Sequence, residues 1–299
     1  MNDRGTGLIQ RAAERLRRQQ AGASEASPGP EAPPPVAGPA PVLAPPRPVD
    51  PIPSLTANGP RQSREISIDR QLLAKAGITF SVTERSRIAE EFRIITRQIL
   101  AKADALSGMA SRVIMVTSAR PREGKTFTAI SLALAIASQP DFHVLAVDCD
   151  VERHSMSQLF GLAPEKGFVD LLADDKTDMR DVLLRTDIAN LSLLPAGPWR
   201  GGVPELLSSR RMREILTEMA QRYADRYIVI DAPPCLATSD PSILASFVGQ
   251  IVFVVEANRT QESEVEESIR LISTCPNISL VLNKVEGTAS DHFGSYGYY

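Results

Sequence analysis

The sequence predicts an α/β fold with a mostly parallel, doubly wound sheet and helices on both faces. From Ser111 onward, short and almost continuously apolar segments alternate with segments whose apolar residues recur at helical spacing. Strands that are buried on both faces have this composition, and parallel strands need helical crossovers. A glycine-lysine-threonine loop follows the first such strand, and aspartates follow two others. Since ligands of these sheets bind beyond the carboxyl ends of the strands, we expect the functional site there.

The period of the apolar residues places the individual elements. Short apolar runs predict strands at residues 113–117, 144–147, 191–194, 227–230, 251–255 and 279–282. Helical spacing predicts helices at residues 125–138, 204–223, 239–247 and 261–275. An earlier helix is expected at residues 83–105, with Thr83 as its N-cap and an apolar stripe that includes Phe92 and Ile99. Together these elements predict one domain over residues 66–290.

Two segments of different composition precede this domain. Residues 1–20 predict a basic amphipathic helix, because Leu8, Ile9 and Leu16 share one face and arginines occupy much of the rest. That helix is either an ordinary solvated helix or a docking element for a partner helix or an anionic membrane face. Residues 21–65 hold 13 of the 23 prolines and are expected to form a disordered, semi-extended linker.

The bulk composition excludes several classes of protein. A net charge of −3 gives no indication of nucleic acid as a partner. The three cysteines, Cys149, Cys235 and Cys275, have no metal-ligand spacing and no disulfide pattern, as a reducing compartment allows. The chain has neither the run of roughly 18 apolar residues that a membrane helix needs nor the apolar core of a signal peptide. We therefore expect a cytoplasmic protein.

The loop between the first strand and the next helix has the features of a phosphate-binding loop. Gly124 allows close backbone approach, the helix N-terminus offers unpaired N–H groups, Lys125 can reach terminal phosphates, and the Thr126 hydroxyl can ligate Mg²⁺. Ala119 stands where the usual pattern has its first glycine. The alternative is a chance Gly-Lys-Thr at the start of an ordinary helix. The residues that we assign to the nucleotide site are Arg120, Pro121, Arg122, Glu123, Gly124, Lys125, Thr126 and Phe127.

Two further strands deliver carboxylates to the same edge of the sheet. Asp148 and Asp150 follow one apolar strand, and Asp231 follows another. Aspartate at the end of a buried strand is costly without a cation or a hydrogen-bond partner. We expect Thr126, Asp150 and Asp231 to hold Mg²⁺ beside ATP, and Asp148 to be the base, although Asp148 and Asp150 could exchange roles. The alternative for each aspartate is an ordinary turn or helix cap.

With these motifs, the chain resembles the bacterial tyrosine kinases, which are built on a P-loop NTPase fold. The family has a phosphate loop, a second acidic motif and a third motif of the Asp-x-Pro-Pro kind, here Asp231 to Pro234. It also has a tyrosine-rich tail, as residues 291–299 do here. The resemblance implies an ATP-dependent and Mg²⁺-dependent autokinase that phosphorylates Tyr296, Tyr298 and Tyr299 and regulates exopolysaccharide synthesis and export.

The resemblance also implies partners. The family's Glu-x-x-Arg-x-x-Arg motif mediates ring assembly, and Glu90, Arg93 and Arg97 are the corresponding residues here, with Arg97 one place late. A membrane-embedded polysaccharide co-polymerase is expected to activate the kinase and recruit it to the inner membrane face. The runner-up is a partitioning or division-site ATPase switch, which hydrolyses ATP without phosphorylating protein. Those ATPases have a signature lysine at the position of Arg120.

Overall fold

The computed structural model describes residues 64–78, 86–106, 109–153, 155–162, 166–198, 203–207, 209–222 and 226–285. The expected N-terminal helix, all but the last two residues of the expected linker, Thr83 and the three tail tyrosines lie outside these residues. None of the helices in this described part is long and apolar enough to cross a membrane.

An eight-stranded sheet runs through the described domain in the order β1-β4-β5-β3-β6-β2-β7-β8. Every neighbouring pair is parallel except β4 and β5, which are antiparallel. The predicted α/β class with a mostly parallel sheet is therefore confirmed. The strands are β1 (Glu65–Ile66), β2 (Val113–Ser118), β3 (His143–Asp148), β4 (Leu184–Thr186), β5 (Leu191–Leu194), β6 (Arg226–Asp231), β7 (Gln250–Glu256) and β8 (Ile278–Asn283).

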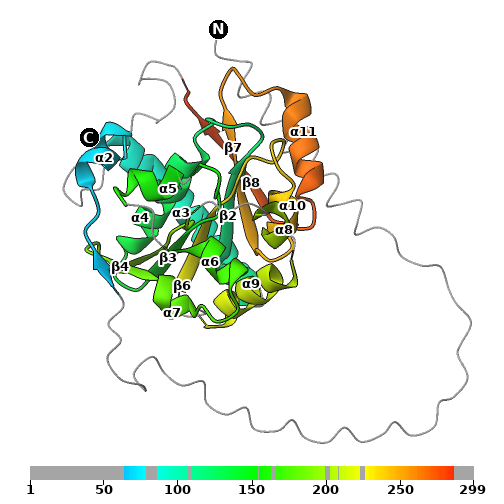
Figure 1. The fold of residues 1–299 in the computed structure, drawn as a ribbon. Helices are drawn as coiled ribbons and strands as arrows, with labels where there is room; N and C mark the ends of the chain where they lie inside the picture. The colour runs from blue at the N-terminus through cyan, green and yellow to red at the C-terminus, as the bar shows by residue number, and fades with distance from the viewer. Residues whose placement is uncertain are drawn as a thin grey trace, which may run out of the picture.

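Helices cover both faces of this sheet. One face carries α2 (Arg70–Lys75), α3 (Arg87–Ala105), α4 (Lys125–Ala137) and α5 (Ser155–Leu159). The other carries α6 (Phe168–Ala173), α7 (Met179–Val182), α8 (Val203–Leu207), α9 (Arg210–Arg222), α10 (Asp240–Leu244) and α11 (Glu262–Leu271). Figure 1 shows α2 to α5 on the left of the sheet and α8 to α11 on its right. A short 3-10 turn, η1 (Met109–Arg112), leads into β2.

The central strands contribute side chains to two hydrophobic cores, one on each face of the sheet. Along β2, Ile114 and Val116 face the core under α3 and α4, whereas Val113 and Met115 face the core under α9 and α11. This alternation is what a strand buried on both faces requires. Since β3, β6 and β2 are neighbours and run in the same direction, their carboxyl ends meet at one edge of the sheet.

Several predicted boundaries are wrong. The predicted helix at 204–223 is two helices, because α8 ends at Leu207 and α9 begins at Arg210. The hydroxyl of Ser209 accepts a hydrogen bond from Met212 N at 3.2 Å and so caps α9. The first long helix begins at Arg87, and its N-cap is Ser86. The strands β1 and β4 and the helices α2, α5, α6 and α7 were not predicted. Each is at most six residues long, too short to show a period.

Candidate active site

The loop between β2 and α4 has the backbone geometry of an anion-binding loop. Gly124, at the N-terminus of α4, has a φ of +100°. Residues with a Cβ adopt this backbone conformation only at a cost in free energy. A Cβ at this position would lie 2.0 Å from Asn283 Nδ2, so glycine is needed for space as well. No side chain caps α4. The first N–H groups of this helix therefore remain available to an anion, such as the phosphates of a nucleotide.

The side chain of Lys125 lies between two carboxylates at the edge of the sheet. Its Nζ atom is 2.6 Å from Asp150 Oδ2 and 3.3 Å from Asp231 Oδ1. All three side chains are buried, with 6%, 3% and 0% of their area exposed. Burial lowers the pKa of Lys125, but the charges of Asp231 and Asp150 outweigh it and raise this pKa above the ordinary value. The predicted convergence of Lys125, Asp150 and Asp231 is thus observed.

Asp148 lies beside this group, in register with Asp231 on the neighbouring strand. Its Oδ2 atom accepts hydrogen bonds from Ser157 N at 3.1 Å and Ser157 Oγ at 2.9 Å. Burial and the charge of Asp231 raise the pKa of Asp148 to about 7. Burial also raises the pKa of Asp231, while Lys125 acts in the opposite direction. Two carboxylates this close cannot both ionise without a compensating cation.

The donor atoms fit a hard divalent cation bound together with a nucleotide. Asp148 Oδ1 and Asp231 Oδ2 are buried without a hydrogen-bond partner in the described structure, a costly state that a bound cation relieves. No group of three or more His, Cys, Asp or Glu side chains in the described ranges is arranged to hold a metal by itself. Mg²⁺ usually takes only one or two carboxylates and completes its shell with water and phosphate oxygens. The hydroxyl of Thr126, next to Lys125 on α4, is a further oxygen ligand of the kind that Mg²⁺ accepts.

Residues at the end of β8 and on α11 hold the phosphate loop from the side. Asn283 Nδ2 donates to Glu123 O at 2.9 Å, and Lys284 Nζ donates to Arg122 O at 2.6 Å. Both side chains therefore hold the backbone of the phosphate loop. Arg120, whose side chain is 64% exposed, forms an ion pair with Glu264 on α11. Glu264 and Ser157 were not predicted as site residues, because neither belongs to a motif that indicates a nucleotide site.

The charged residues of α3 lie on one exposed face. Glu90, Arg93 and Arg97 are all exposed, and Arg93 Nη1 pairs with Glu90 Oε2 at 2.5 Å. Thr96, the residue in strict register with the motif, is buried. Positions 90, 93 and 97 are neighbours on a helix because they are separated by three and four residues. The shift by one place therefore keeps Arg97 on the same face as Glu90 and Arg93.

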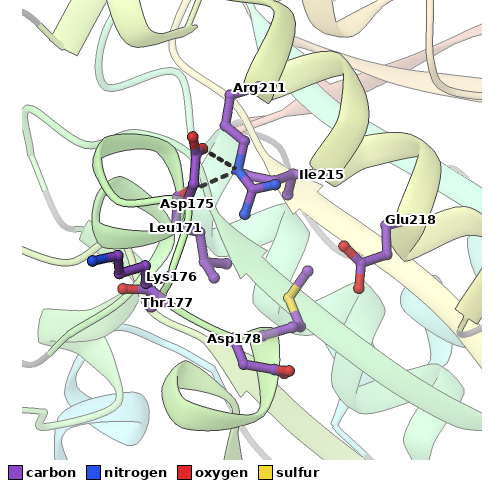
Figure 2. A pocket seen from close by; sticks show the side chains of 9 residues that line it. Leu171, Asp175, Lys176, Thr177, Asp178, Arg211, Ile215 and Glu218 are labelled. Atoms are coloured by element: carbon purple, nitrogen blue, oxygen red, sulfur yellow. Dashed lines mark hydrogen bonds and ion pairs between the residues drawn. The ribbon is translucent and has the colours of Figure 1, made fainter.

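A separate cavity of about 270 Å³ lies between α9 and the segment that joins α6 to α7. Figure 2 shows Arg211 reaching across to Asp175 and to the backbone of Leu171. The lining residues are Leu171, Asp175, Lys176, Thr177, Asp178, Met179, Arg211, Ile215 and Glu218. None of the predicted nucleotide or metal residues, all of which lie in the described part of the chain, lines this cavity.

The chain is similar to several known proteins. The AAA domain family matches residues 111–282. The chain is 28% identical over 241 residues to tyrosine-protein kinase YwqD of Bacillus subtilis (strain 168), covering 79% of this chain and 95% of that protein. It is 30% identical over 217 residues to the putative tyrosine-protein kinase CapB of Staphylococcus aureus, covering 72% and 91%. The solved kinase domain of Escherichia coli tyrosine kinase ETK superposes with a TM-score of 0.60 at 25% identity, covering 78% of this chain and 93% of that one.

Proposed function

Because the chain belongs to the family of bacterial tyrosine-protein kinases, we propose that it is an ATP-dependent tyrosine autokinase. The proposed reaction transfers the γ-phosphoryl group of ATP to Tyr296, Tyr298 and Tyr299 of the tail. One observation carries the proposal: Lys125, Asp150 and Asp231 converge beside Asp148 at the N-terminus of α4. Phosphoryl transfer depends on positioning and charge neutralisation, and this cluster offers both.

Each residue has a role that follows from its position. The backbone N–H groups of residues 122–126 bind the phosphates, and Lys125 neutralises charge on the group being transferred. Thr126, Asp150 and Asp231 are the proposed ligands of Mg²⁺, which neutralises phosphate charge when bound. The acceptor phenol forms a bond to the γ-phosphorus while the bond from that phosphorus to the bridging oxygen breaks, which releases ADP.

Asp148 is the proposed acceptor of the phenolic proton. Asp150 is paired with Lys125, whereas Asp148 Oδ1 has no hydrogen-bond partner among the described residues. Ser157 holds the other oxygen of Asp148 and so orients the carboxylate. A carboxylate whose pKa is raised toward neutrality is a better base than an ordinary aspartate at physiological pH.

The tail is the proposed acceptor because other tyrosines are scarce. The chain has five tyrosines, and three of them are among its last four residues. Tyr227, on β6, is 1% exposed and its ring packs in the core, so it cannot reach an active site. Phosphates on adjacent tail tyrosines would add about −1.5 to −2 charges each. The resulting repulsion would favour disassembly of a ring formed through the charged face of α3.

The wider setting of the kinase follows from its family and is also part of the proposal. We place the protein in the cytoplasm, recruited to the inner membrane face by a membrane-embedded polysaccharide co-polymerase that activates it. Residues 1–20 are the proposed docking element and residues 21–65 the tether. Through phosphorylation and dephosphorylation of the tail, the protein would regulate exopolysaccharide synthesis and export.

A variant with Phe at Tyr296, Tyr298 and Tyr299 separates the kinase from the ATPase switch. Wild-type and variant proteins are incubated with γ-labelled ATP and Mg²⁺, with and without a candidate membrane partner, and both protein-bound label and free phosphate are measured. If the protein is an autokinase that phosphorylates its tail, the wild type should carry label and the variant should carry little. Equal labelling of the two proteins, or release of phosphate to water with no label on either, would contradict it.

A further inference from the structure

The side chain of Glu123 is buried beneath the phosphate loop, although it belongs to that loop. Only 3% of the residue is exposed. Its Oε2 atom accepts a hydrogen bond from Arg120 N at 2.7 Å, which closes the loop on itself. Its Oε1 atom accepts a hydrogen bond from the hydroxyl of Thr260, which lies 137 residues further along the chain. The carboxylate therefore joins the loop to the turn between β7 and α11.

Thr260 is itself held firmly in that turn. Its Oγ1 atom accepts a hydrogen bond from Glu256 N at 3.0 Å, and its backbone N–H donates to Glu256 O at 3.2 Å. The residue is 7% exposed, so water does not compete strongly for its hydroxyl. Further along, Glu264 Oε2 accepts a hydrogen bond from Gln261 N at 2.9 Å in a capping box, and Glu264 also pairs with Arg120. These bonds hold the turn to the end of β7.

We infer that Thr260 is a positioning residue, which acts through Glu123 to set the phosphate loop in its nucleotide-binding conformation. The inference rests on the proposed function, since it concerns the same site. A loop already held in the binding conformation loses little entropy when phosphates bind, whereas a loose loop must be ordered at that moment. Hydrogen bonds to a buried carboxylate are also stronger than neutral ones. Thr260 does not touch the nucleotide in this scheme, so it is not a catalytic residue.

Thr260→Val tests the inference because valine keeps the shape of threonine and removes only the hydroxyl. We expect this variant to raise the KM for ATP, and the Kd for Mg·ADP, about tenfold, with kcat for autophosphorylation within about twofold of wild type. Thr260→Ser retains the hydroxyl and should restore both constants. Glu123→Gln, which keeps the shape but weakens one of the two bonds, should give an intermediate KM even if Thr260→Val folds poorly.

Thr186→Val is the matched control. The hydroxyl of Thr186 donates to Leu191 O at 2.9 Å and accepts from Ile188 N at 3.2 Å, near the opposite edge of the sheet. Its loss should lower the melting temperature without changing the KM for ATP. If Thr260 had only a structural role, Thr260→Val would likewise lower the melting temperature without changing the KM for ATP. A smaller folded fraction lowers the apparent kcat and leaves KM unchanged.

The outcomes separate this inference from the proposed function. Binding of Mg·ADP is measured by calorimetry on the full chain and does not depend on phosphate transfer. If the wild type binds nucleotide but Thr260→Val binds it equally well, the positioning role is overturned while the kinase proposal stands. If the wild type binds nucleotide and labels no tyrosine, the kinase proposal fails, and the two Kd values still decide the role of Thr260.

Discussion

Lys125 Nζ lies 2.6 Å from Asp150 Oδ2, at the point where the phosphate loop meets the end of β3. The lysine is thus the counter-ion of a buried carboxylate, and Asp231 shares it at 3.3 Å. The residue proposed to bind phosphate therefore also stabilises two buried carboxylates. A nucleotide must compete with Asp150 and Asp231 for this ammonium group.

Lys125→Met should destabilise the nucleotide-free protein. Removing the lysine leaves two buried carboxylates without a counter-ion, and breaking a buried ion pair in this way costs about 3 kcal/mol or more. Urea unfolding at pH 7.5 in the absence of nucleotide measures the change. Lys102→Met removes a lysine that bonds Ser279 at the surface and should change the free energy of unfolding far less. A Lys125→Met variant as stable as wild type would show that the ion pair is unimportant.

Asp148→Asn should stabilise the nucleotide-free protein at alkaline pH. The pKa of Asp148 is raised from 3.8 to about 7 in the folded state, so folding favours the protonated form. The wild type therefore loses stability as the pH rises from about 4 to about 7, and the loss is complete above the folded pKa. Asparagine carries no proton to lose, so the variant should be more stable at pH 8, on the order of 2 to 4 kcal/mol, and similar at pH 4.

Urea unfolding of both proteins at pH 4 and pH 8, in EDTA to exclude metal ions, measures the difference. Asp69→Asn is the control, since Asp69 is an exposed N-cap of α2 and asparagine caps helices equally well. An Asp148→Asn variant that is less stable than wild type at pH 8 would contradict the raised pKa of Asp148.

The predicted parts of the structure are those with a local signal. The strands β2, β3 and β6 each contain an apolar run of at least four residues. The rule that ligands bind at the carboxyl ends of parallel strands then predicts that Lys125, Asp148 and Asp231 lie close together. The break between α8 and α9 could not be seen, because a pair of serines interrupts a helical pattern only weakly.

The supporting residues of the site had no such signal. Ser157 and Thr260 are single hydroxyl residues whose partners lie 9 and 137 residues away in the sequence. Neither residue belongs to a periodic pattern, and serine and threonine are common in turns for local reasons. Only the packing of α5 against β3, and of the β7–α11 turn against the phosphate loop, reveals what these hydroxyl groups contact.

Arg93→Ala combined with Arg97→Ala should reduce self-association. Both arginines lie on the exposed face of α3, so their loss should leave the melting temperature within a few degrees while lowering the mass of the assembly and the extent of autophosphorylation several-fold. Light scattering measures the mass. Arg210→Ala, which breaks an equally local ion pair with Glu214 on α9, should assemble as wild type does. If the double variant assembles normally, α3 is not the interface.

Mapping the phosphate on the full chain after incubation with Mg·ATP tests the central claim most directly. Tandem mass spectrometry of wild-type protein, activated by its membrane partner, should find phosphate on Tyr296, Tyr298 and Tyr299. The Lys125→Met variant should carry none at these positions. Phosphorylated tail tyrosines in Lys125→Met, or a wild type that turns over ATP with its tail unmodified, would contradict the account.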